Sequence, residues 1–109
     1  MEVIDISNLG PWDGLKQIMV FINEQASYNK IITNAQLGTF LMDAFEAQQL
    51  PVIKPSLGLI KNPETYKIIK LKHADVFVDP NMRWDDTKLI FKSNDKEKIV
   101  EIKHSNNLI

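Results

Sequence analysis

Cysteine is absent from the 109-residue chain, which excludes disulfide bonds and thiol catalysis and fits a reducing compartment. Glycine is scarce and scattered, so the sequence has no glycine-rich phosphate-binding loop. No apolar run approaches the roughly 18 residues that a membrane span needs. The first ten residues, MEVIDISNLG, contain two acids and no base, which is unlike a secretory signal. These absences predict a cytoplasmic protein without a membrane partner.

An excess of charge of either sign is also missing. The 13 basic and 14 acidic residues give a net charge of −1, whereas nucleic-acid-binding proteins usually carry a basic excess or stripe. We therefore expect no direct contact with nucleic acid. The length predicts a single domain over residues 1–109. In this prediction residues 1–11 form an arm or an edge strand, and residues 93–109 form a polar C-terminal strand or tail.

Side chains suited to catalysis are present without a catalytic spacing. His73 and His104 lie far apart in the sequence and outside any metal-ligand pattern. Asp75, Asp79, Asp85 and Asp86 form the densest acidic group, and carboxylate oxygens are the ligands that hard cations prefer. A metal-dependent enzyme would use Asp75, Asp79 and Asp86. Turn formation and solvation explain the same aspartates. We predict no catalytic residue, no cofactor and no metal, and keep a small metal-dependent enzyme as a third hypothesis.

The first predicted helix covers residues 12–26. Its apolar residues recur at three- and four-residue spacing and form one stripe, made by Leu15, Ile18, Met19, Ile22 and Ala26. Val20 and Phe21 widen this stripe beyond one face. The extra width indicates either deeper burial in a single core or a second surface that contacts something else.

The second predicted helix covers residues 35–48 and ends before Pro51, which cannot continue it. Thr33 is the expected N-cap, because Gln36 follows at the spacing of a capping box. Gly38 lies inside the helix, where glycine lowers helix propensity by about 1 kcal/mol relative to alanine. A glycine retained at this position indicates close packing against a neighbouring element.

The second half of the chain is predicted to be rich in strands. Short runs of β-branched and aromatic residues at 66–71, 76–78 and 89–91 are separated by turn residues that include Pro80. Residues 31–32 suit a further short strand. The predicted fold class is α+β, with two helices packed on one face of a mainly antiparallel, meander-like β-sheet.

The order of these pieces resembles the peripheral (P) domain region of tailed-phage major capsid proteins of the Hong Kong 97-type fold, over about residues 12–92. The likeness rests on the order and spacing of Tyr28-Asn29-Lys30-Ile31-Ile32-Thr33-Asn34, the helix 37–45, Ala74-Asp75-Val76-Phe77-Val78-Asp79-Pro80 and Asp86-Thr87-Lys88-Leu89-Ile90-Phe91-Lys92. The family's Gly-Tyr-Lys-Gly-like ending is replaced here by Ile90-Phe91-Lys92-Ser93, and its subunits are usually several times longer. The resemblance therefore implies an excised domain, half of a split subunit, or a small relative.

Three functions are compatible with this interpretation. The leading hypothesis is a non-enzymatic structural protein of a bacteriophage virion, assembled in the host cytoplasm, which associates with itself or with other capsid subunits into a shell. The second is a phage-encoded or bacterial adaptor that adds a strand to a partner through residues 61–72 or 3–6. The third is the metal-dependent enzyme. Interface candidates are Val20, Phe21, Trp84 and Trp12, because tryptophan is enriched at binding hot spots.

Overall fold

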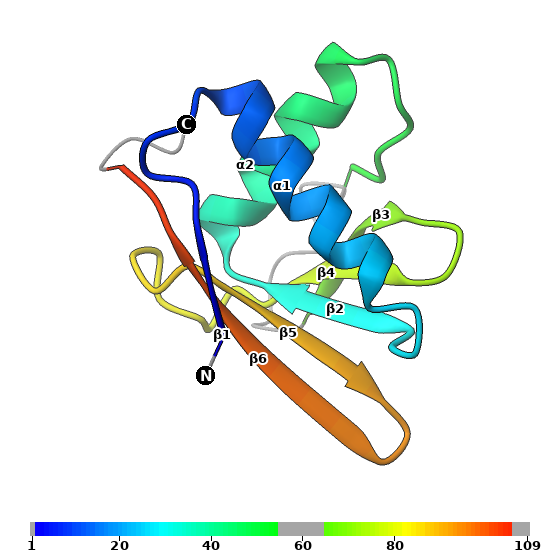
Figure 1. Cartoon of the computed structure of the whole chain (residues 1–109). Helices are drawn as coiled ribbons and strands as arrows, with labels where there is room; N and C mark the ends of the chain where they lie inside the picture. The colour runs from blue at the N-terminus through cyan, green and yellow to red at the C-terminus, as the bar shows by residue number, and fades with distance from the viewer. Residues whose placement is uncertain (1, 55–64, 106–109) are drawn as a thin grey trace.

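The computed structural model describes residues 2–54 and 65–105, and this part of the chain forms two helices and six strands (Figure 1). In chain order these elements are β1 (Glu2–Asp5), α1 (Pro11–Glu24), β2 (Lys30–Thr33), α2 (Ala35–Ala47), β3 (Tyr66–Lys70), β4 (Asp75–Val78), β5 (Lys88–Ser93) and β6 (Lys96–Lys103). Within the described ranges, no helix has the length and apolarity to cross a membrane. Residues 55–64, which include part of the predicted 61–72 binding segment, lie outside the described residues.

All six strands belong to one sheet with the order β1-β6-β5-β2-β4-β3, and both helices lie over one face of it (Figure 1). The α+β prediction is confirmed. The prediction of a mainly antiparallel meander is wrong, because the sheet is mixed. β1 runs parallel to β6, and β2 runs parallel to β4, while the other pairs are antiparallel.

The mixed sheet follows from the central position of β2. Its Ile31 is fully buried beneath the helices, and its Ile32 is buried on the opposite face. In register, Ile32 lies between Phe77 of β4 and Ile90 of β5, so the two neighbouring strands cover it. A strand that is apolar on both faces is most stable in the interior of a sheet. β2 therefore separates β4 from β5, which a meander would have paired.

The core lies between this sheet and the two helices. Ile18 and Ile22 of α1 are buried, and on the sheet Leu89 and Phe91 of β5 are fully buried. The prediction placed the end of α1 at residue 26, but the helix ends at Glu24. The imidazole Nε2 of His73 lies 3.2 Å from the Ile22 carbonyl oxygen, near that end. This carbonyl belongs to the last turn and also accepts the N–H of Gln25 at 3.0 Å.

At the start of α2 the N-cap is Asn34 and not the predicted Thr33. The Oδ1 atom of Asn34 accepts a hydrogen bond from the Leu37 N–H at 3.3 Å. The hydroxyl of Thr33 instead donates to the Lys88 carbonyl at 2.8 Å, which links β2 to β5. Further along α2, a Cβ added at Gly38 would overlap Cγ2 of Val78 on β4. The prediction of close packing at Gly38 is therefore confirmed.

Candidate interaction surfaces

The connection from β4 to β5, residues 79–87, forms the first candidate surface. Because β2 lies between β4 and β5, this connection must step around the junction where β2 passes into α2. Its first residue, Asp79, donates its N–H to the Thr33 carbonyl at 2.9 Å. Near its other end, the Thr87 carbonyl accepts the N–H of Ile102 on β6 at 3.0 Å. Both ends of the connection are thus attached to the sheet.

The middle of the connection is held by Asn34. This side chain is fully buried, and its Nδ2 donates to the Arg83 carbonyl at 3.1 Å and to the Trp84 carbonyl at 2.9 Å. Since Oδ1 of the same amide caps α2, one buried residue satisfies the helix end and fixes the connection. The backbone at Trp84 is therefore positioned by the interior of the protein.

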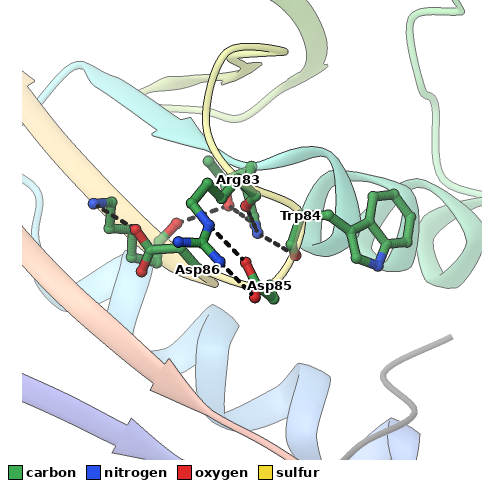
Figure 2. Close-up of polar contacts among 7 residues, drawn as sticks. Arg83, Trp84, Asp85 and Asp86 are labelled. Carbon is green, nitrogen blue, oxygen red and sulfur yellow. Dashed lines mark hydrogen bonds and ion pairs between the residues drawn. The ribbon is translucent and has the colours of Figure 1, made fainter.

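Two ion pairs lie on the solvent side of the 79–87 connection. Arg83 donates to both carboxylate oxygens of Asp85, at 3.1 and 3.0 Å, and Lys88 pairs with Asp86 at 3.1 Å. Arg83 and Asp85 are largely exposed, and such pairs contribute little to stability. Figure 2 shows that the indole of Trp84 projects away from these polar contacts. The residue is 52% exposed, so a large apolar side chain is presented to solvent from a fixed backbone.

An open groove with a volume of about 710 Å³ lies beside Trp84. Its walls include Val3, Gln36, Trp84, Glu101, Lys103 and His104. Polar contacts order part of this wall: the hydroxyl of Thr87 lies 3.0 Å from Oε1 of Gln36 and 2.9 Å from Nε2 of His104. The groove combines one exposed aromatic side with a polar side, which suits contact with another macromolecule.

A second candidate surface lies along α1 and the adjacent edge strand β1. Val20 of α1 is 57% exposed and Val3 of β1 is 53% exposed. A smaller groove of about 260 Å³ separates the two elements. It is lined by Val3, Ile4, Asp5, Gln17, Val20, Phe21 and Glu24. Large exposed apolar side chains beside a groove are a feature of binding surfaces.

The four predicted interface residues lie at different places in the structure. Trp84 belongs to the first surface and Val20 to the second, while Trp12 is 47% exposed at the start of α1. Phe21 is half-buried, and its ring packs edge-on against Phe91 with 5.7 Å between the ring centroids. Phe21 thus contributes to the core as well as to the groove, which makes it a poor choice for testing binding.

The acidic residues of the enzyme hypothesis have separate partners. Asp75 pairs with Lys67 at 3.1 Å, Asp86 pairs with Lys88, and Asp79 accepts the N–H of Asn81 at 2.9 Å. No group of three or more metal-ligating side chains occurs among residues 2–54 and 65–105. The structure therefore does not bring these three carboxylates together as a metal site.

Asp5, at the end of β1, accepts hydrogen bonds from the hydroxyl of Ser7 at 2.5 Å and from its N–H at 2.9 Å. These bonds lower the pKa of the Asp5 carboxyl below its usual 3.8. A lowered native pKa stabilises the folded chain above pH 3.8, and this contribution disappears as the pH falls through the native value.

We therefore expect Asp5→Asn to be less stable than the native chain at pH 6 and to match it at the lowest pH. Urea unfolding of both proteins from pH 6 downward measures the difference. A difference that stays constant with pH would contradict the titration of Asp5 as its cause.

The fold and surfaces define a small α+β protein with a mixed sheet, two helices on one face, and two candidate interaction surfaces with exposed apolar side chains. No family model matches the chain, and searches of curated proteins and of solved structures likewise returned no match.

Proposed function

We propose that this chain is a non-enzymatic structural domain of the phage capsid type, which associates with copies of itself or with other capsid subunits into a shell. The observation that carries the proposal is Trp84, a half-exposed indole on a backbone fixed by the buried Asn34. Fixing an aromatic residue before binding reduces the conformational entropy that association must overcome. The resemblance of residues 12–92 to capsid proteins supports the same proposal, including a location in the virion.

Two different surfaces favour association of the head-to-tail kind. The Trp84 surface lies at the β2–α2 junction, and the Val20 surface lies on the flank of α1 next to the edge of the sheet. In head-to-tail association, one surface of each copy contacts a different surface of the next copy. Such contacts close into rings or extend into lattices, and many weak contacts add up to a stable assembly.

Substitution of the exposed residues tests the proposal. Trp84→Asp and Val20→Asp place a charge on each surface, and we expect each to reduce assembly by at least about tenfold in association constant. Neither change should alter the fold, because both side chains are exposed. Sedimentation velocity of each variant over a range of concentrations measures the effect.

Leu50→Asp is the matched control, since Leu50 is 47% exposed and lines neither of the two grooves described above. It should assemble as the native chain does. Normal assembly of both Trp84→Asp and Val20→Asp, with native circular dichroism, would remove the basis for assigning these surfaces to self-association.

A further inference from the structure

We propose that β1 and the adjoining flank of α1 bind an extended, basic segment of a different protein, which adds a strand to the edge of the sheet. This site is the second surface described above, which shares Val3 with the groove beside Trp84, so a bound segment and a second copy would compete for it. The proposal does not depend on self-association. It rests on three features of the described residues: a sheet edge with unpaired backbone groups, a groove beside that edge, and the acidic character of the groove.

The backbone of β1 has its outer side free. The Ile6 N–H donates to the Lys103 carbonyl on β6 at 2.8 Å, and Ile4 is in register with Ile102 of the same strand. Backbone groups alternate in direction along a strand, so those of Ile4 and Ile6 point to β6. The N–H and C=O groups of Val3 and Asp5 therefore point outward. An edge with such groups is a template for a further strand.

The opposite edge of the sheet differs. There β3 is the last strand, and its Ile68 carbonyl accepts the N–H of Ile53 at 2.7 Å. The chain after α2 thus uses part of the outer side of β3. Of the two edges in the described sheet, β1 is the one for which the structure shows no such contact from the chain.

A strand added next to β1 would also contact α1. The groove between them is lined on the helix side by Gln17, Val20, Phe21 and Glu24. Side chains of the added strand that lie on the same face as Ile4 would enter this groove, because side chains alternate between the faces of a sheet. An apolar residue opposite Ile4 would cover Val20, which is more than half exposed in the isolated chain.

The charges beside the groove indicate which charge the bound segment carries. Asp5 and Glu24 line the groove and no basic residue does, while Lys103 of β6 is in register with Asp5 beside it. The nearby Lys98 of β6 is already engaged, with its Nζ 2.6 Å from Glu2 and 3.1 Å from the side-chain oxygen of Gln25. A second copy pairing through its own β1 would bring a second set of these carboxylates to the edge, which is unfavourable. The groove therefore fits a Lys- or Arg-containing segment of another protein.

The expected segment alternates apolar and polar residues. One basic residue lies two positions after an apolar residue, so both side chains are on the same face of the added strand. In an antiparallel arrangement, the apolar residue lies opposite Ile4 and the basic residue two positions later lies opposite Glu2. α1 runs back along β1 after the turn at residues 6–10, so its last residue, Glu24, lies toward the Glu2 end of the strand. The basic residue would then approach Glu24.

Binding of synthetic peptides to the full chain tests the proposal. The probe is a soluble seven-residue peptide of alternating threonine and valine that carries one lysine in the stated position. The controls are the same peptide with glutamate in place of lysine, and a version N-methylated on the edge-facing amides. We expect the lysine peptide to bind at least about tenfold more tightly than either control. Amide hydrogen exchange, followed by NMR, should slow at Val3 and Asp5.

Two protein variants complete the test. Val3→Pro removes one outward N–H without removing a β1–β6 bond, since proline is tolerated at a free strand edge. Val20→Lys leaves the backbone intact and adds a positive charge to the groove, so it should reduce the preference for the lysine peptide over the glutamate peptide. Binding that is unchanged in both variants, binding that leaves exchange at Val3 and Asp5 unaltered, or no binding of the lysine peptide at millimolar concentration would overturn the proposal.

Discussion

Replacing Asn34 by alanine should lower the free energy of unfolding by about 3 kcal/mol and release the segment that carries Trp84. The change removes the cap of α2, worth about 1 kcal/mol, together with two hydrogen bonds to the carbonyls of Arg83 and Trp84. The Trp84 carbonyl loses this donor at a partly buried position, where an unsatisfied polar group costs about 1–3 kcal/mol, while the Arg83 carbonyl still accepts the N–H of Asp86 at 3.2 Å. Urea unfolding measures the stability.

Asn34→Asp separates the two roles of this residue. Aspartate keeps the oxygen that accepts from Leu37 and is itself a good helix cap, but it lacks the Nδ2 donor to the connection. We expect both variants to increase the mobility of Trp84, seen as a lower fluorescence anisotropy in a Trp12→Phe background. Should Asn34→Ala unfold at the same urea concentration as the native chain, or leave the anisotropy unchanged, Asn34 does not fix the segment.

Gly38→Ala should destabilise the protein by about 2 kcal/mol, although alanine is the better helix former by about 1 kcal/mol. The new methyl group would overlap Cγ2 of Val78, which is buried on β4 and has little freedom to rotate because it is β-branched. α2 would have to move away from the sheet to relieve the overlap. Thermal and urea unfolding of the variant measure the loss.

A double substitution tests whether contact with Val78 causes the destabilisation by Gly38→Ala. Val78→Ala alone leaves a cavity and is expected to destabilise the core. In that background Gly38→Ala should fill part of the space and become neutral or stabilising by about 1 kcal/mol. If Gly38→Ala is equally destabilising with valine or alanine at position 78, close contact between α2 and β4 is not the reason for the glycine.

The helices were predictable from the sequence because their signals are local. The stripe containing Ile18 and Ile22 and the glycine at 38 depend on residues a few positions apart. The strand order was not predictable, because it depends on pairing between distant segments. The insertion of β2 between β4 and β5 follows from burial of Ile31 and Ile32 on both faces, which a two-residue apolar run does not reveal.

The exposure of the candidate interface residues was predictable in part. Val20 stands out because it widens the apolar stripe of the first helix, Trp12 and Trp84 stand out as the two tryptophans, and all three are exposed. Asn34 was missed as the residue that positions Trp84, although an asparagine directly before a helix is a signal for an N-cap. Its contact with Arg83 and Trp84 arises only because the 79–87 connection passes the β2–α2 junction. No local pattern in the sequence contains that information.

The measurement that tests the central claim most directly is the solution mass of the native chain over a concentration series, by light scattering after gel filtration. Association through the Trp84 and Val20 surfaces predicts a mass that increases with concentration, toward rings or shells visible by electron microscopy. A mass of 12.5 kDa at every concentration, for a chain with native circular dichroism, would contradict self-association.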